Sequence, residues 1–301
     1  MNEKVYLQLS LYSQPILIVL GTIGALLNQI LFRREKSLRS ASCSLYFRAL
    51  SVNDLLVLYF VVLTQWLNDQ FGLDPMNKHS WYCKIRTYSI YFLYAMSPYF
   101  IVLGCFDRLC RSSRNSRWRR IATLSVARHV IPILVVLILL IYVHIPFQFD
   151  LIESVCLPLN ATYFQFLGYF LLIFYCLLPP ILMSIFCTCT CLFLNHHRGK
   201  QRLRGVLTVV TSVHTYRPYR DYQLMKLLFL YVVTNIICTL PFTVVFLLNV
   251  YHYGSAPQLA ILIKCTVLLA NVNYCTSFYV YTLSTPLYRR ELGRMMSDLR
   301  R

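Results

Sequence analysis

Charged residues are scarce in this chain of 301 residues. They make up 13% of the sequence against 57% hydrophobic residues, whereas about a quarter of the residues in soluble domains are charged. So few charges could not solvate the surface of a compact soluble fold. A soluble all-helical protein with a large core is the alternative. The apolar stretches fill the chain almost end to end and favour a single membrane domain over residues 1–301.

Segments with a regular alternation of polar and apolar residues are also missing. A membrane barrel would need such alternation in strands of about 10 residues. Lipid offers the backbone no hydrogen-bond partners, so apolar stretches of about 20 residues predict membrane-spanning helices. We therefore expect an all-α membrane protein, a bundle of seven transmembrane helices within residues 11–283. The seven charge-poor stretches lie at approximately 11–32, 45–67, 87–106, 129–147, 163–194, 227–250 and 259–283.

Acidic residues are few, and the basic residues are unevenly placed. The chain has 11 Asp and Glu against 29 Lys and Arg, a net charge of +18. Five of the Lys and Arg fall on one side of the predicted bundle and 24 on the other, which the positive-inside rule assigns to the cytoplasm. Residues 1–10 are then extracellular, the C-terminus is cytoplasmic, and the basic face can contact anionic membrane lipid. No recognised nucleic-acid-binding module accompanies the charge, so we expect no nucleic-acid partner.

Motifs of several other functional classes are absent from the sequence. No nucleophile–base pair and no metal-ligand spacing indicates an enzyme, and the pair His196-His197 lies in a basic loop where solvated side chains are expected. No internal inverted repeat is detectable, and the spans contain too few charges for an ion path, which argues against a transporter or a channel. We therefore expect no enzyme activity, no catalytic residues and no cofactor beyond a possible sodium ion.

The loop after the fourth stretch has two features that agree with an extracellular position. Asn160 begins a glycosylation sequon, Asn160-Ala161-Thr162. Cys156 can reach Cys83 at the outer end of the third stretch, and the oxidising compartment on that side permits a disulfide. The other ten cysteines lie in or near the spans, where small core residues are expected and palmitoylation is the alternative.

Short motifs occur in a characteristic order along the chain: Gly24 to Asn28, Leu50 to Leu55, Asp107-Arg108-Leu109, Pro179-Pro180, Cys238 to Pro241, Ser277 to Tyr281, and Tyr288. Their order and spacing resemble those of the rhodopsin-like (family A) G-protein-coupled receptors over about residues 11–299. The resemblance implies a plasma-membrane receptor that binds an extracellular ligand and promotes nucleotide exchange on a heterotrimeric G protein. It also implies a C-terminal helix eight.

Several positions depart from the family pattern. Leu109 replaces the Tyr of the Asp/Glu-Arg-Tyr motif, and Thr239 replaces a Trp that is often described as a toggle. The segment that begins at Ser277 aligns with Asn-Pro-x-x-Tyr and retains only the final Tyr281. These changes leave the predicted fold intact. They concern how ligand binding would move the sixth helix.

Asp54 lies near the middle of the second span, where an ionisable group costs at least about 2.5–3.5 kcal/mol and needs partners. The resemblance implies Ser97 on the third helix and Asn273 on the seventh as partners, with Ser277 nearby. A carboxylate with neutral oxygens suits a sodium ion, which is a hard cation. The alternative is a protonated Asp54 in a structural hydrogen-bond network.

Asp107 and Arg108 form the acid–arginine pair at the inner end of the third span. The family often has a second acid at the start of the sixth helix, and counting back 20 residues from Pro241 gives Asp221. We hypothesise that Asp221 holds the planar fork of Arg108 in the inactive state. The sixth helix, kinked at Pro241, would release Arg108 toward a G protein, with Tyr281 among the switch residues. The alternative for Asp221 is a solvated loop charge.

Residues 286–301 predict an amphipathic helix that lies on the membrane surface. Apolar residues recur at helical spacing on one face, and mostly basic residues take the rest. The apolar positions are Tyr288, Leu292, Met295, Met296 and Leu299.

The predicted ligand-binding half of the bundle lacks the residues that are typical of two receptor classes. Amine receptors have an aspartate where this chain has Ile90, and opsins have a lysine where it has Asn271, so the resemblance argues against both classes. Aromatic walls with a few polar groups suit a short peptide or a small apolar ligand, although aromatic belts at membrane interfaces are the alternative. Asp150 and Glu153 could attract a cationic peptide, or could simply be solvated. The candidate pocket residues are Ile90, Tyr91, Tyr94, Phe246, Asn249, Lys264 and Asn271.

Three functions remain open on the sequence alone. A receptor for a short neuropeptide is the interpretation that we favour. A chemosensory receptor for a small molecule has the same fold and would differ in tissue expression. A non-signalling scaffold or decoy is the third, and Leu109 and Thr239 keep it open.

Overall fold

The fold described here is that of a computed structural model of the chain. The backbone is described for residues 3–34, 42–73, 75–113, 115–152, 155–204, 216–251, 257–284, 289–290, 292–294 and 297. Side chains are described throughout these ranges except at 3, 77, 195–204, 216–228, 257–258 and 280–284.

Within the described residues, seven helices are long and apolar enough to cross a membrane, which confirms the predicted seven-helix bundle. The first helix begins at Glu3, eight residues before the first predicted stretch, so residues 3–10 are helical. The segments that build the seven spans are α1 (Glu3–Arg34), α3 (Ser42–Val57) with η1 (Leu58–Leu63) and α4 (Thr64–Phe71), α5 (Ser80–Ser112), α7 (Leu124–Tyr142) with α8 (Ile145–Gln148), α9 (Ala161–Leu171) with η3 (Leu172–Leu177) and α10 (Leu178–Arg204), α11 (Tyr216–Tyr251), and α12 (Pro257–Ser284).

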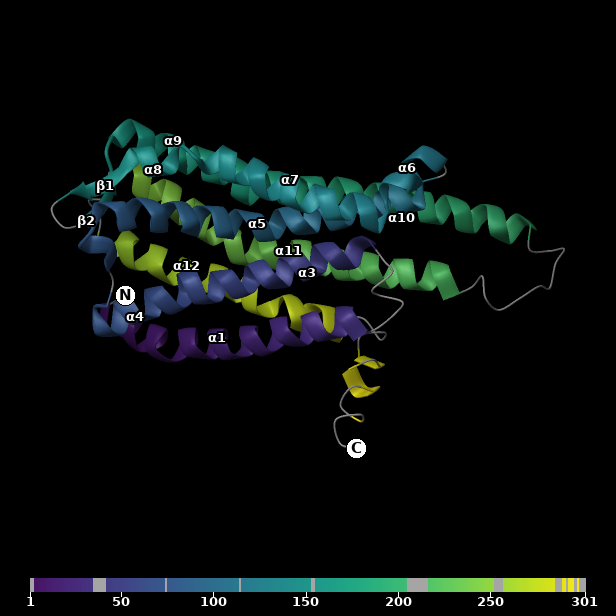
Figure 1. The fold of residues 1–301 in the computed structure, drawn as a ribbon, viewed down its shortest axis with the longest axis horizontal. Coiled ribbons are helices and arrows are strands. Elements are labelled where there is room, and N and C mark those ends of the chain that lie inside the picture. The colour runs from purple at the N-terminus through teal and green to yellow at the C-terminus, as the bar shows by residue number, and fades with distance from the viewer. Residues whose placement is uncertain are drawn as a thin grey trace.

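The helix α5 lies at the centre of the bundle. It packs against α3, α7, α10 and α11, and 61% of its most apolar 18-residue segment is buried. By contrast, 17% of the corresponding segment of the α7 span is buried. That helix therefore lies at the periphery, with most of its apolar surface facing outward. Figure 1 shows α5 running lengthwise between α7 on one side and α3 on the other.

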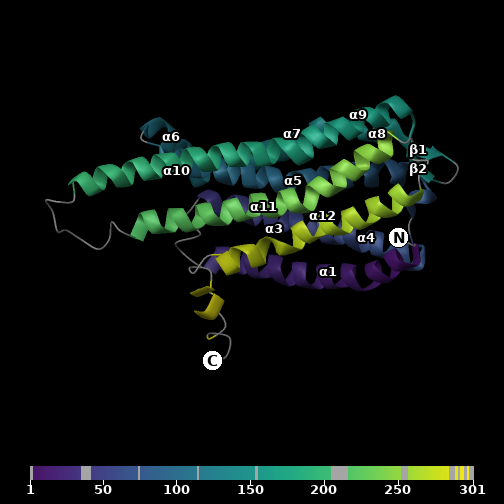
Figure 2. The same cartoon turned by 180° about the vertical axis from the view of Figure 1, so that it is seen from behind.

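The two ends of the bundle differ. A two-stranded hairpin, β1 (Phe149–Ile152) and β2 (Val155–Pro158), lies beside α5 and α8 at one end, the end at which α1 begins (Figure 1). The short helix α6 (Ser116–Ile121) lies at the other end, where α5 finishes at Asp107 to Ser112. Figure 2 shows the same division from behind. We call these the hairpin end and the Arg108 end.

The hairpin is the one sheet among the described residues, and the sequence analysis did not predict it. Its strands pair antiparallel with Leu151 opposite Cys156, and the amide of Leu159 donates to the carbonyl of Gln148 at its base, 2.8 Å away. The strands are only four residues long, too short to give a periodicity signal, and an isolated hairpin has little stability of its own. Attachment to the bundle therefore accounts for it.

The second and fifth spans each contain one π-helical turn, η1 and η3. A π turn inserts one residue into an α-helix, and such turns are frequent at functional sites. Beyond η1, the span ends at Gly72, whose φ of 64° is the left-handed conformation that glycine adopts at helix ends. The consequence is that α4 is rotated about its axis relative to an uninterrupted continuation of α3.

Candidate functional site

Asp54 is the centre of a buried polar network in the middle of the bundle. It is 1% exposed. The hydroxyl of Ser97 on α5 donates to its Oδ1 at 2.7 Å, and the hydroxyl of Ser277 on α12 donates to its Oδ2 at 2.8 Å. The amide of Asn53 donates to Ser97 Oγ at 2.8 Å and to the carbonyl of Leu93 at 2.9 Å. The network joins the second, third and seventh spans through their side chains.

Asn273 was predicted to contact Asp54, and the structure gives that contact to Ser277 instead. Asn273 lies four residues before Ser277 on α12, which places both on the same face of the helix. Its side chain is fully buried, and its Oδ1 and Nδ2 have no hydrogen-bond partner among the described residues. Hard cations prefer oxygen ligands. The carboxylate, two hydroxyls and a spare amide oxygen therefore fit a sodium ion chemically.

At the Arg108 end, the structure gives Asp107 a partner that the sequence analysis did not name. The hydroxyl of Ser42, the first residue of α3, donates to Asp107 Oδ1 at 2.5 Å. Ser42 also lies 3.3 Å from the carbonyl of Ala122 and accepts from Arg111 at 3.3 Å. Ser42, at the start of the second span, therefore contacts both Asp107 on α5 and the segment after α6. Arg108 is 4% exposed.

For the other predicted switch residues, Pro241, Asp221 and Tyr281, the structure describes fewer contacts. Pro241 lies within α11, and the side chains of Asp221 and Tyr281 lie outside the described residues. Near Pro241, the hydroxyl of Thr243 donates to the carbonyls of Thr239 and Leu240. Neither of these is the carbonyl that Pro241 leaves without an amide donor, which belongs to Ile237, four residues before it.

Two of the predicted pocket residues, Tyr94 and Asn271, bind each other. The hydroxyl of Tyr94 on α5 donates to Asn271 Oδ1 on α12 at 2.7 Å. The Tyr274 ring stacks on the Tyr94 ring, 5.2 Å between centroids, and its hydroxyl donates to the Tyr94 carbonyl at 3.0 Å. Tyr175 lies 3.1 Å from the Tyr274 hydroxyl. A tyrosine cluster thus joins the third, fifth and seventh spans above Asp54.

The other predicted pocket residues are distributed around this cluster. Phe246 packs edge-on against Phe164, with centroids 5.4 Å apart, while Ile90, Tyr91 and Asn249 are half-buried. Lys264 lies apart from the group, because its ammonium stands 5.2 Å from the ring centroid of Tyr6 on α1.

Tyr6 belongs to residues 1–10, which were predicted to be an extracellular N-terminus outside the first span. Its hydroxyl donates to Asp69 Oδ2 at 2.6 Å, and the amide of Gln70 donates to the carbonyl of Leu7 at 3.1 Å. These contacts hold the start of α1 against α4. They explain why the helix begins before the apolar stretch does.

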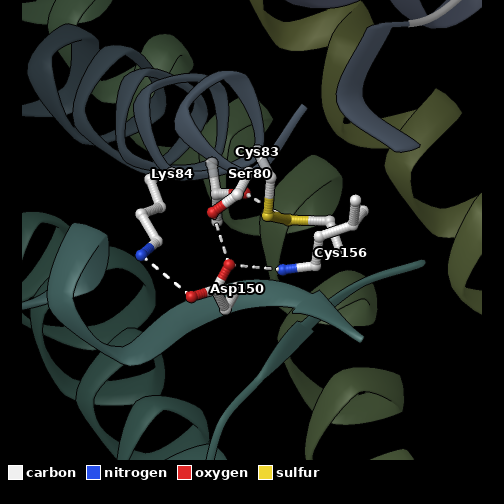
Figure 3. Close-up of a disulfide and its surroundings, with 7 residues drawn as sticks. Ser80, Cys83, Lys84, Asp150 and Cys156 are labelled. Carbon is white, nitrogen blue, oxygen red and sulfur yellow. Dashed lines mark hydrogen bonds and ion pairs between the residues drawn. A yellow bond between two sulfur atoms is a disulfide. The ribbon is translucent and has the colours of Figure 1, made fainter. Parts of the chain in front are cut away.

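Cys83 and Cys156 form a disulfide between α5 and β2, with Cα atoms 5.7 Å apart (Figure 3). Beside it, the hydroxyl of Ser80 donates to Asp150, and the ammonium of Lys84 lies 2.9 Å from Asp150 Oδ2. The Ser80 hydroxyl, Lys84 and the Leu151 amide together lower the pKa of Asp150 to about 2. Asp150 is therefore already bound within the protein and is not a free solvated acid.

Asn160 is exposed at the start of α9, and its side chain makes no capping hydrogen bond there. A glycan on this side chain would displace no contact that the structure describes.

Two residues that matter for the site escaped the sequence analysis. Ser42 was missed because a serine at a helix start usually caps its own helix. Arg86 was counted only among the five basic residues on the outer side, yet it lies within α5, is 9% exposed and donates to Thr64 Oγ1 at 3.0 Å. An arginine placed three residues after Cys83, at the edge of a charge-free span, was the available signal.

The architecture is that of a seven-helix membrane receptor with a disulfide at one end and a buried acid–arginine pair at the other. The family model for the 7 transmembrane receptor (rhodopsin family) matches residues 24–281. The chain belongs to this family and is a multi-pass membrane protein and a G-protein-coupled receptor by family. No curated protein matches the chain.

Proposed function

We propose that the chain is a plasma-membrane receptor that binds an extracellular ligand at the hairpin end and promotes nucleotide exchange on a heterotrimeric G protein at the Arg108 end. The basic residues of α6, at the Arg108 end, support this orientation by the positive-inside rule. The disulfide and the exposed sequon residue Asn160 at the hairpin end support it as well, because both modifications occur on the extracellular side.

The observation that carries the proposal is the buried pair Asp107-Arg108 at the basic end of a bundle from a receptor family. Asp107 is bound to Ser42, so its carboxylate holds α3 against α5. Arg108, whose guanidinium is shielded from water, is the group that a G protein would reach when the sixth span moves away. In this proposal Asp221 is the acid that restrains Arg108 in the inactive state.

For the ligand we propose a short neuropeptide. The tyrosine cluster of Tyr94, Tyr175 and Tyr274 and the ring of Phe246 give aromatic surfaces with polar ends on the hairpin side of Asp54, which suits a peptide with aromatic side chains. The same surfaces support a chemosensory receptor for a small aromatic molecule as the second candidate.

Nucleotide exchange in membranes that contain a heterotrimeric G protein tests the coupling proposal. Asp221→Ala is expected to raise basal exchange severalfold, because it removes the restraint on Arg108. Arg108→Ala is expected to reduce exchange to the level of membranes without the receptor. Arg33→Ala, which removes an exposed arginine at the end of α1, is the control and should leave exchange unchanged.

Equal exchange in all four proteins, at equal surface expression, would contradict the coupling proposal. In that case the scaffold or decoy function, to which the substitutions at Leu109 and Thr239 point, would be favoured.

We further propose that Asp54, Ser97, Ser277 and Asn273 bind a sodium ion. Sodium at about ten times its Kd is then expected to stabilise the purified protein by about 1.4 kcal/mol relative to N-methylglucamine, measured by thermal unfolding. Asp54→Asn should remove this difference, whereas the matched substitution Asp69→Asn at the hairpin end should retain it. A sodium effect that survives in Asp54→Asn would mean that Asp54 serves only as a structural hydrogen-bond acceptor.

A further inference from the structure

Two buried thiols lie next to each other where the third and fifth spans meet, near the Arg108 end. The Sγ atoms of Cys105 on α5 and Cys187 on α10 are 3.7 Å apart. Cys105 is 1% exposed and Cys187 is 8% exposed. Neither residue takes part in the coupling, sodium or ligand sites proposed above. The pair is therefore a cluster of nucleophilic side chains that still lacks a function.

The two helices are in close contact at this level, so the thiols are held together by more than their own contact. α5 and α10 run side by side (Figure 1). The rings of Phe106 and Phe186, the chain neighbours of the two cysteines, pack with centroids 5.5 Å apart. To form a disulfide, the sulfurs have to move from 3.7 Å to about 2.0 Å apart. This requires rotation of both side chains about χ1 and at most a small shift of the helices.

The turn of α5 that carries Cys105 leads directly to Arg108, which lies three residues further on, about one helical turn. Toward the second span this part of α5 is already fixed, because the hydroxyl of Ser42 donates to Asp107. Toward the fifth span, a bond between Cys105 and Cys187 would fix α10 in the same way. The thiol pair thus lies where a covalent bond would act on the end of the bundle that is proposed to meet the G protein.

We propose that Cys105 and Cys187 are a site of reversible oxidation, at which hydrogen peroxide joins the third and fifth spans by a disulfide. In the first step, one sulfur attacks the O–O bond of the peroxide, which gives a sulfenic acid and one water. The other thiol then attacks the sulfenic sulfur, so that the S–S bond forms and a second water leaves. The peroxide gains two electrons, the two sulfurs lose one each, and both thiol protons end in water.

Burial decides which oxidant can act at this pair. A thiol in apolar surroundings reacts slowly, because its thiolate form is disfavoured there. A large charged disulfide such as oxidised glutathione cannot enter between α5 and α10, whereas hydrogen peroxide is small and neutral. Cys187 is the more exposed of the two thiols and is the one that the peroxide reaches first. Its sulfenic acid condenses with the adjacent Cys105 thiol, which prevents irreversible oxidation to the sulfinic acid.

The formation of the bond does not depend on the proposed function, but its effect on signalling rests on it. In the proposed function, a G protein reaches Arg108 when the sixth span moves away. The fifth span precedes the sixth in the chain, so fixing α10 to α5 is expected to restrain that movement. The oxidised receptor should therefore promote nucleotide exchange severalfold more slowly than the reduced receptor.

Peptide mass spectrometry tests the inference on the purified receptor, treated with hydrogen peroxide and then alkylated under denaturing conditions. The natural chain is expected to yield a linked peptide that contains Cys105 and Cys187. It should lose two of its ten free thiols to this bond, and dithiothreitol should restore both. Oxidation should also raise the melting temperature without G protein, because the bond closes a loop between two spans.

Three variants show which residues are responsible. Cys105→Ala and Cys187→Ala should each abolish the linked peptide, the rise in melting temperature and the slower exchange after oxidation. Cys275→Ala removes another buried cysteine, on α12, and as the matched control it should retain all three effects. The linked peptide is measured on the natural chain, so the inference is tested even if Cys105→Ala does not fold.

The inference is overturned if the natural chain yields no linked peptide, if both sulfurs end as separate sulfinic acids, or if Cys275→Ala abolishes the linked peptide as Cys105→Ala does. Equal exchange by the oxidised and reduced receptors would overturn the effect on signalling. These outcomes are separate from the fate of the proposed function. The peptide and melting measurements use no G protein, and the response of basal exchange to Asp221→Ala and Arg108→Ala involves no oxidation.

Discussion

Replacing Cys83 and Cys156 together by serine is expected to lower the free energy of unfolding by about 4 kcal/mol, the value that chain entropy predicts for a loop of this length. The two cysteines are 73 positions apart in the sequence, and the closed loop contains the third and fourth spans. The β1–β2 hairpin is held to α5 by this bond and by the contacts of Asp150 with Ser80 and Lys84.

The expected result includes a strong loss of protein at the cell surface, because the hairpin would be held only by the polar contacts of Asp150 and by the packing of Phe149. Thermal unfolding of the purified double variant, together with labelling of intact cells, measures both effects. Cys191→Ser, at an exposed free cysteine, is the matched control and should behave as the natural chain does. Unchanged unfolding of the double variant would show that the hairpin contacts suffice without the bond.

Gly24→Leu is expected to destabilise the bundle by about 3 kcal/mol, at the upper end of what overpacking a core costs. A Cβ atom at position 24 would lie 3.0 Å from the Cβ of Phe278 on α12, and a Cβ atom cannot move aside without its backbone. The side chain would therefore push α1 away from α12. The hydrogen bond from the Tyr279 hydroxyl to the Leu20 carbonyl, 3.0 Å long, would open as well.

A comparison of melting temperatures in one detergent measures this effect. Gly293→Leu is the matched control, since a Cβ atom at that glycine meets nothing within 4 Å, and it should leave the melting temperature unchanged. Equal melting of Gly24→Leu and the natural chain would mean that α1 can repack against α12 at no cost.

The number of spans could be predicted from the sequence because the length of each charge-free stretch can be read along the chain, without knowing how the helices pack. The contact of Asp54 with Ser97 was also within reach, since the spacing of these residues matches a known pattern. The choice between Asn273 and Ser277 as its second partner was not, because both lie on one face of α12 and the choice depends on the position of α12 along its axis. The contact between Asp107 and Ser42 was hidden because a serine at a helix start usually caps its own helix.

Other features were hidden for different physical reasons. The start of α1 at Glu3 depends on the contact of Tyr6 with Asp69, whose residues are 63 positions apart. The hairpin depends on its attachment to α5, which short strands do not reveal. The burial of Arg86 depends on the packing of α4 against α5, and its place after Cys83 was the one signal in the sequence.

The π-helical turn η1, at Leu58–Leu63, has a consequence for comparing this chain with its relatives. One extra residue turns everything beyond it by about 100° around the helix axis. Deletion of one residue from 58–63 would therefore carry Thr64 away from Arg86 and Asp69 away from Tyr6, while Asp54, on the other side of η1, would stay in place. A relative that lacks the extra residue would be misaligned by one position from Thr64 to Phe71, although its motif at Asp54 would still match.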